Sequence, residues 1–166
     1  KYSIGEAAAR QGNGQPATPP EALPATDAYT RVQDELRRSK LAADEETSLI
    51  NPREKVEPII ELVDQAGKVF VCGLGDDGLI AREFAMRLSL LGLLTIHHAD
   101  PILMMSNLSA ARRGDVLLMV SEFGKLPVIS QLSRQFQACE GKVVSVTRNT
   151  SNPLRAHADA SLVISA

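Results

Sequence analysis

The chain has 166 residues, which is long enough for one domain with a hydrophobic core of its own. Its 18 basic and 20 acidic residues leave a net charge of −2 and form no long basic run, so the composition does not support nucleic-acid binding by this segment. No apolar stretch approaches the roughly 20 residues that span a bilayer, nothing resembles a signal peptide, and the cysteines form no disulfide framework, so we expect a soluble cytoplasmic protein.

The first part of the chain is expected to precede the main domain. Residues 1–26 are rich in proline and have little hydrophobic periodicity, which predicts a linker or the tail of a missing N-terminal domain. Residues 27–66 are charged and helix-favouring, and we expect them to form connecting helices.

Two connecting helices are predicted in this segment. The first covers residues 27–50, with Asp27 as a plausible N-cap and only a thin apolar stripe, as in helices that lie on a surface or bridge to another domain. The second follows Asn51, a predicted cap, and closes at Gly67. Pro58 removes a backbone donor, so it predicts a kink or a helix that begins there.

From residue 67 onward, short apolar runs alternate with amphipathic stretches. This alternation is typical of parallel strands buried on both faces and covered by helices, so it predicts an α/β fold of three layers with a five-stranded parallel sheet, preceded by linker helices. The chain stops at its fifth strand, so we expect a domain that is truncated at its C-terminus and has one sheet face short of cover. The strands are predicted at 68–74, 94–98, 115–121, 142–147 and 161–165, and the helices at 78–91, 101–111 and 127–138.

The loop after the first predicted strand runs from Gly73 to Gly78 and matches G-x-G-x-x-G between a strand and a helix. Ligands of open parallel sheets bind beyond the carboxyl ends of the strands, and a glycine loop before a helix can cradle a pyrophosphate. Asp76 and Asp77 would repel that phosphate by an energy on the order of several kcal/mol. Dinucleotide binding therefore stays an alternative, beside a plain glycine turn whose helix is capped by aspartates.

The loop after the third predicted strand covers residues 121–127. Ser121 can offer a hydroxyl and Lys125 can meet an anion, whereas Glu122 works against an anionic ligand. The same residues can also form a solvated loop before a helix. A third loop at residues 147–153 belongs to the same sheet edge.

Catalytic and metal-binding patterns are not apparent in the sequence. The three histidines, His97, His98 and His157, have no metal-ligand spacing to one another or to a cysteine. No nucleophile stands in a recognisable pattern with a base. We therefore predict no catalytic residue, no metal and no cofactor.

Residues 67–166 resemble a sugar isomerase (SIS) domain, in particular the effector-binding part of RpiR-family bacterial transcriptional regulators. The resemblance rests on VFVCGLGDDGLIAREFAMRLSLLG, on the GDV that leads into the third strand, and on NPLRAHAD before the fifth strand, similar to the family's SPLA–AD segment. It implies a flavodoxin-like SIS fold, a homodimer, a sugar or sugar-like effector, and DNA binding only through an absent helix-turn-helix head. It implies no membrane partner.

The loops depart from the family pattern at three positions. A serine of the first loop is replaced by Asp77, and a serine and a threonine of the S-x-S-G-x-T loop are replaced by Phe123 and Leu126. Three hydroxyls that would face a phosphate are thus missing and a carboxylate has appeared. The effector is expected to be non-phosphorylated, with an amino or cationic group that pairs with Asp76 or Asp77, or the pocket has lost its ligand and survives as a dimerisation module.

The resulting functional hypothesis is the effector-sensing and dimerisation domain of an RpiR-like regulator of sugar or related metabolism. A sugar-phosphate isomerase is the alternative, and it is disfavoured because a phosphate cradle and a matching His–Glu set are missing. A dinucleotide-binding domain is the second alternative. The predicted ligand-binding residues are Gly75, Asp76, Asp77, Ser121, Glu122, Gly124, Lys125 and Leu126.

Overall fold

The computed structural model describes residues 27–166, and predictions for residues 1–26 fall outside them. The described chain divides between Leu36 and Arg37, within the first helix, and the sheet belongs to the compact unit of residues 37–166. The helices are α1 (Ala28–Ile50), α2 (Arg53–Asp64), α3 (Asp76–Leu90), α4 (Pro101–Leu108), α5 (Pro127–Ala138) and the 3-10 helix η1 (Pro153–Ala156). The strands are β1 (Val69–Cys72), β2 (Thr95–His97), β3 (Val116–Val120), β4 (Lys142–Arg148) and β5 (Ala160–Ile164).

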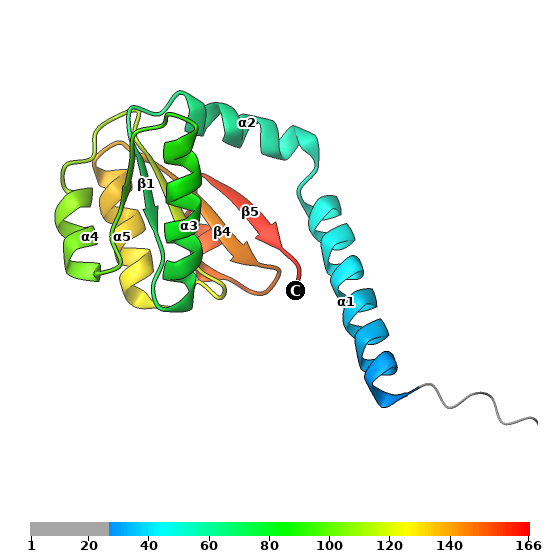
Figure 1. The fold of residues 1–166 in the computed structure, drawn as a ribbon. Helices are drawn as coiled ribbons and strands as arrows, with labels where there is room; N and C mark the ends of the chain where they lie inside the picture. Colours follow the sequence, from blue (N-terminus) through cyan, green and yellow to red (C-terminus); the bar gives the residue numbers. More distant parts are fainter. Residues whose placement is uncertain (1–26) are drawn as a thin grey trace, which may run out of the picture. The chain divides into compact units, whose positions relative to one another are not determined.

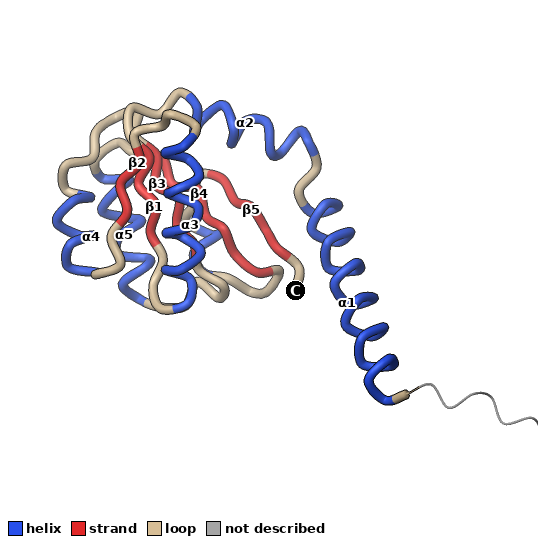
Figure 2. Tube along the Cα trace, in the orientation of Figure 1, coloured by secondary structure: helices blue, strands red, loops and turns tan. Residues whose placement is uncertain are grey.

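The five strands form one parallel sheet in the order β2-β1-β3-β4-β5, which confirms the predicted fold class (Figure 2). β1 and β3 are neighbours in register, with Val69 opposite Val116. The chain leaves β1 toward β2 on one side and returns to β3 on the other, so the strand order reverses between β1 and β3. This reversal is where ligands bind in open α/β sheets.

Two apolar cores lie on the two faces of the sheet because successive side chains of a strand point to opposite faces. Phe70 of β1 packs with α4 and α5 on one face, and its ring meets Phe136 edge-on with centroids 5.3 Å apart. Val71 of β1 packs with α2 and α3 on the other face. All five residues of β3 are buried, in agreement with its uninterrupted apolar sequence. Figure 1 shows α3 lying along β1.

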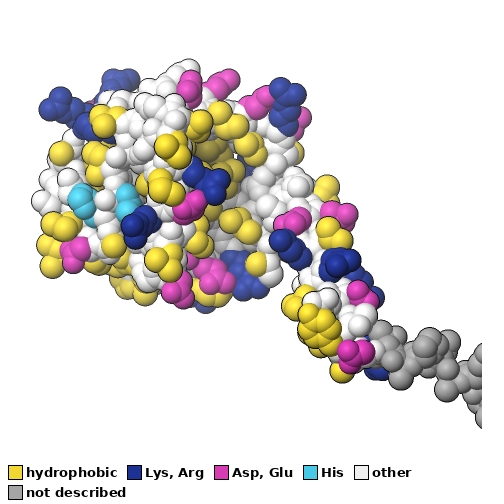
Figure 3. Space-filling model, viewed as in Figure 1, with side chains coloured by type: hydrophobic (Ala, Val, Ile, Leu, Met, Phe, Trp, Pro, Cys, Tyr) yellow, Lys and Arg dark blue, Asp and Glu magenta, His cyan; other side chains and the backbone are white. Residues whose placement is uncertain are grey.

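The face that carries α2 and α3 is partly open beside Leu118 of β3 and Leu162 of β5. A pocket of about 280 Å³ lies there, and Figure 3 shows a hollow lined by hydrophobic side chains beside α3. Ile60 of α2 is 59% exposed and Phe84 of α3 is 38% exposed at its rim. This face of the sheet is therefore less closely covered than the face that carries α4 and α5.

The start of α2 differs from the sequence prediction. The helix begins at Arg53 and runs through Pro58, so the alternative that it starts at Pro58 is wrong. The proline removes the hydrogen bond to the carbonyl of Glu54, and both residues are exposed, so water can solvate that carbonyl. The residue at the N-cap is Pro52, without a side-chain cap, and Asn51 has a different role.

Asn51 hydrogen-bonds the free edge of β5 instead of capping α2. Its side-chain oxygen accepts from the Val163 N–H (2.9 Å) and its amide nitrogen donates to the Val163 carbonyl oxygen (2.5 Å). One turn earlier, the Thr47 hydroxyl accepts from the Ser165 N–H at 2.9 Å. These side chains occupy backbone groups that an edge strand otherwise offers to another chain.

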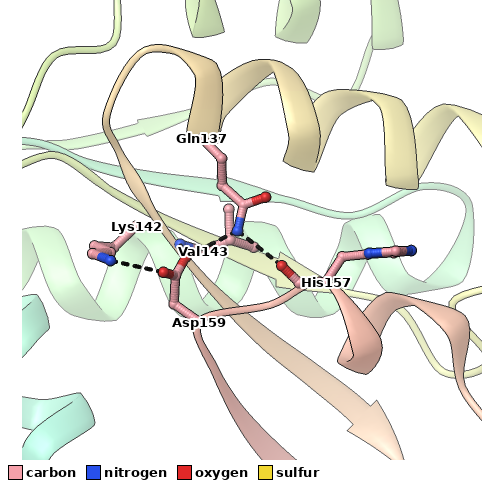
Figure 4. Close-up of polar contacts among 5 residues, drawn as sticks. All are labelled: Gln137, Lys142, Val143, His157 and Asp159. Carbon is pink, nitrogen blue, oxygen red and sulfur yellow. Dashed lines mark hydrogen bonds and ion pairs between the residues drawn. The ribbon is translucent and has the colours of Figure 1, made fainter.

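A polar cluster joins the end of α5 to the starts of β4 and β5 (Figure 4). Asp159 accepts hydrogen bonds from Lys142 Nζ (2.8 Å), the Val143 N–H (2.9 Å) and Gln137 Nε2 (3.1 Å). Gln137 Nε2 also donates to the carbonyl oxygen of His157 at 2.8 Å. Partial burial by itself would raise the pKa of Asp159, but these hydrogen bonds and the charge of Lys142 outweigh burial and hold the pKa below its ordinary value.

Candidate functional site

The loops that follow β1 and β3 lie next to each other at the reversal of strand order, because the two strands are neighbours and parallel. The β1 loop leads into α3 and the β3 loop leads into α5. Each helix presents its N-terminus, with free N–H groups and partial positive charge, to this edge of the sheet.

Close packing in the first loop depends on glycine. A Cβ at Gly73 would lie 2.4 Å from the carbonyl oxygen of Asp77, and Gly75 has a positive φ of 62°. α3 begins at Asp76, two residues before the predicted start, so both aspartates stand in its first turn. Carboxylates are favourable there because they face the positive end of the helix.

Asp77 and Asp76 have different surroundings. Asp77 is partly buried and its Oδ2 accepts a hydrogen bond from the Glu122 N–H at 3.1 Å, which ties α3 to the β3 loop. Burial raises the pKa of the Asp77 carboxyl, the nearby carboxylates of Glu122 and Asp76 raise it further, and the hydrogen bond opposes them. Asp76 is exposed. The first loop therefore places a single partly buried acid at the site.

The β3 loop is shaped by Ser121, Gly124 and Asn152. Ser121 is buried, and its hydroxyl accepts from the Gly124 N–H at 3.1 Å. Gly124 has a φ of 58°, and a Cβ there would lie 1.8 Å from the side-chain oxygen of Asn152. Asn152 also donates to the Glu122 carbonyl oxygen at 3.3 Å. The third loop thus packs under the second and requires glycine at position 124.

A pocket of about 330 Å³ opens at this edge. It offers a carboxylate, an ammonium group, a buried hydroxyl and an aromatic ring within one small volume. Phe123 is 44% exposed, and Lys125 Nζ lies 5.9 Å from its ring centroid. An exposed aromatic ring beside polar groups suits a ligand with both apolar and polar faces. The lining residues are Asp77, Ser121, Phe123, Gly124, Lys125 and Leu126.

Five of the eight predicted ligand-binding residues line this pocket, and three do not. Gly75 and Asp76 lie in the first loop and are exposed, outside the lining. The Glu122 carboxylate pairs with Arg148 Nη1 at 3.0 Å. The site assignment itself stays a prediction.

Phe123 and Arg148 were not among the predicted site residues. In the sequence Phe123 stands only as the replacement of a family serine, although an exposed aromatic residue between Glu122 and Gly124 is itself a signal for ligand contact. Arg148 ends β4 and contacts the carboxylate of Glu122. Its position inside the third candidate loop is the one signal that could have found it.

Histidines and cysteines do not assemble into a site in the part of the chain that the structure describes. Residues 27–166 contain no group of three or more His, Cys, Asp and Glu side chains arranged to hold a metal ion. His97 Nδ1 lies 2.8 Å from the Val71 carbonyl oxygen, a contact that links β2 to β1. Among the described helices, none combines the length and apolar character needed to cross a membrane.

Comparison with curated proteins finds relatives of two kinds. A 3-hexulose-6-phosphate isomerase of Mycobacterium gastri is 30% identical over 141 residues, which cover 85% of this chain and 64% of the isomerase. An uncharacterized HTH-type transcriptional regulator, YfhH of Escherichia coli K12, is 25% identical over 158 residues, covering 95% of this chain and 56% of the regulator. The chain therefore spans less than two thirds of the length of either relative.

Solved structures share the fold. NanR of Vibrio vulnificus complexed with ManNAc-6P superposes with a TM-score of 0.75 at 24% identity, covering 81% of this chain and 51% of NanR. The sugar isomerase domain of an RpiR transcription factor from Sphaerobacter thermophilus gives a TM-score of 0.75 at 19% identity, covering 81% of this chain and 76% of that domain. The predicted resemblance to a SIS domain is confirmed by the SIS domain family, whose profile matches residues 62–166. This chain belongs to the SIS domain family.

Proposed function

We propose that this chain is the effector-sensing and dimerisation domain of an RpiR-like transcriptional regulator. The observation that carries the proposal is the pocket at the strand-order reversal, in which Asp77 and Phe123 stand beside the buried Ser121 hydroxyl. The HTH-type regulator and NanR support a regulatory role among relatives of this chain. In the whole protein, DNA binding belongs to a helix-turn-helix head, and the location is the cytoplasm.

The effector we propose is a non-phosphorylated, amino-bearing sugar. An ammonium group would pair with Asp77, and a sugar ring would lie against Phe123, whose face is apolar and electron-rich. A phosphoryl group would meet Asp77 in a partly desolvated position, and repulsion between the two charges is on the order of several kcal/mol. Lys125 offsets part of this repulsion, but its ammonium is exposed and solvated.

A sugar-phosphate isomerase is the second candidate, and one observation favours it. A carboxylate with a raised pKa in a pocket is what proton abstraction beside a carbonyl requires, and Asp77 has both properties. The isomerase from Mycobacterium gastri is also a relative. Against this candidate, the lining contains no second acid or histidine to return the proton, since its other members are Ser, Phe, Gly, Lys and Leu.

Thermal-shift measurements with glucosamine, glucose 6-phosphate and NAD separate these functions. We expect glucosamine to raise the Tm by several degrees, because a ligand at one hundred times its Kd stabilises the folded state by about 2.7 kcal/mol. Asp77→Ser should abolish this shift and gain one with glucose 6-phosphate. Asp76→Ser is the matched control, because it removes an exposed carboxylate one residue away that does not line the pocket.

Three results would contradict the proposal. A large shift of the unmodified chain with glucose 6-phosphate alone would mean that Asp77 does not exclude phosphate. A shift with NAD alone would favour the dinucleotide alternative. Interconversion of glucose 6-phosphate and fructose 6-phosphate, lost in Asp77→Ser, would make the chain an isomerase.

A further inference from the structure

The pocket loop is connected to the end of β4 by both main chain and side chain. The carbonyl oxygen of Glu122 accepts from the Arg148 N–H at 3.0 Å, and the Glu122 carboxylate pairs with Arg148 Nη1 at 3.0 Å. Glu122 also donates its N–H to Asp77, which lines the pocket. A ligand that draws the Asp77 carboxylate toward itself therefore acts directly on the residue that holds Arg148.

The next residue of the chain connects the sheet to α1. Asn149 donates its side-chain amide to Glu46 Oε1 at 2.9 Å, and its N–H to the Ile164 carbonyl oxygen at 2.8 Å. The second carboxylate oxygen of Glu46 accepts from the Ser165 hydroxyl. Both ends of this arrangement lie in the compact unit of residues 37–166, so the contacts occur within one body.

Each side-chain contact is weak by itself, but the main chain makes the set cooperative. The side chains of Glu122 and Arg148 are 46% and 36% exposed, and a single ion pair of this kind contributes little. The backbone N–H groups of residues 148 and 149 belong to adjacent peptide units, so a displacement of Arg148 also acts on the hydrogen bond from Asn149 to Ile164. A shift of Glu122 therefore reaches Arg148 through a main-chain hydrogen bond and an ion pair together, and the last step to α1 is the side-chain hydrogen bond from Asn149 to Glu46.

We propose that Glu122, Arg148, Asn149 and Glu46 couple occupation of the pocket to the C-terminal half of α1. The proposal rests on the proposed function, since it assumes that a ligand enters the pocket. Glu46, Arg148 and Asn149 are positioning residues that do not line the pocket. An N-terminal DNA-binding head would attach to α1. A regulator of this kind requires that ligand binding in the pocket change α1.

Amide hydrogen exchange tests the coupling without any ligand. Glu122→Gln removes the ion pair with Arg148 at the pocket end, and we expect exchange in residues 42–50 of α1 to become roughly two- to five-fold faster. The matched control is Glu83→Gln, which breaks a similar exposed ion pair with Arg87 on α3, outside the network. Unchanged exchange in α1 of Glu122→Gln, or an equal change in both variants, would overturn the proposal.

A second measurement uses glucosamine and separates the coupling from the ligand itself. In the unmodified chain we expect slower exchange both in residues 121–126 and in residues 42–50. In Asn149→Ala the pocket loop should still respond and α1 should not, whereas Asn107→Ala, whose amide bonds only its own helix, should behave like the unmodified chain. Protection of the loop without any response of α1 in the unmodified chain would contradict the coupling and leave the proposed function standing.

Discussion

Two aspartates of this chain have pKa values shifted in opposite directions, and their neighbours explain the difference. Asp77 is partly buried beside two other carboxylates, and both effects raise its pKa. The one hydrogen bond that it receives lowers the pKa by less, so the net shift is upward. Asp159 is also partly buried, but it receives hydrogen bonds from Lys142, the Val143 N–H and Gln137, so its pKa is lowered. Asp77 therefore costs folding free energy when it is ionised, which fits a binding group, whereas ionised Asp159 stabilises the fold.

Asp159→Asn should lower the free energy of unfolding by about 1–2 kcal/mol at pH 7, because a charged acceptor with three donors is lost. A lowered pKa in the folded state means that the stabilisation is present above the ordinary pKa of 3.8 and disappears as the pH falls through the folded value. Urea denaturation at a series of pH values measures the difference between the two proteins.

The control for this prediction is Glu61→Gln, which changes an exposed acid on α2. Its effect should be small at all pH values. A gap between Asp159→Asn and the unmodified chain that stayed constant from pH 7 to pH 2 would show that Asp159 acts through packing alone.

At the scale of elements, the edge strand β5 is closed by side chains from the segment that joins α1 to α2. Asn51 has a donor and an acceptor in one planar amide, so it can satisfy the N–H and the carbonyl of Val163 together. The same side chain was predicted to cap α2, because an asparagine before a proline and a glutamate fits that pattern. In the structure Asn51 bonds to Val163, 112 positions away, and makes no side-chain cap on α2.

Asn51→Ala should destabilise the chain by about 1–2 kcal/mol, since two partly buried backbone groups of Val163 lose their partner. It should also promote association, because the edge of β5 becomes free for pairing. Chemical denaturation measures the first effect and light scattering against protein concentration measures the second. Asn107→Ala serves as the control, and equal stability of the two variants would refute the role of Asn51.

At the scale of the whole molecule, the two sheet faces are covered to different degrees. The face of α4 and α5 holds a closed core around Phe70 and Phe136, whereas the face of α2 and α3 leaves an apolar pocket open over β5. Cys72 lies in the closed core and is 3% exposed, and burial raises the pKa of its thiol to about 12. Its reactivity should therefore report on opening of that core.

Alkylation of Cys72 should require global unfolding, because a buried thiol with a raised pKa has almost no thiolate at neutral pH. In a Cys139→Ser background, which leaves Cys72 as the single cysteine, the alkylation rate with iodoacetamide should rise with urea in parallel with the unfolding equilibrium. Rapid alkylation without denaturant would mean that the core around β1 opens locally.

Much of the fold could be predicted from local pattern. Helix α5 begins at Pro127 and ends at Ala138 as predicted, and the five strands appear within a few residues of their expected ranges. Boundaries at the site were less predictable: α3 starts at Asp76 because Gly75 adopts a positive φ that ends the turn earlier. For the site, the pattern identified both loops, but not that Phe123 lines the pocket or that Glu122 turns toward Arg148.

The alternation of apolar strands and amphipathic helices in the sequence by itself determined the class of fold, because burial of a strand on both faces depends only on which residues it contains. The order of strands, the contact of Asn51 with Val163 and the network from Glu122 to Glu46 were decided by the tertiary structure alone. These contacts join residues far apart in the chain, and no spacing along a sequence specifies which distant donor will meet which acceptor.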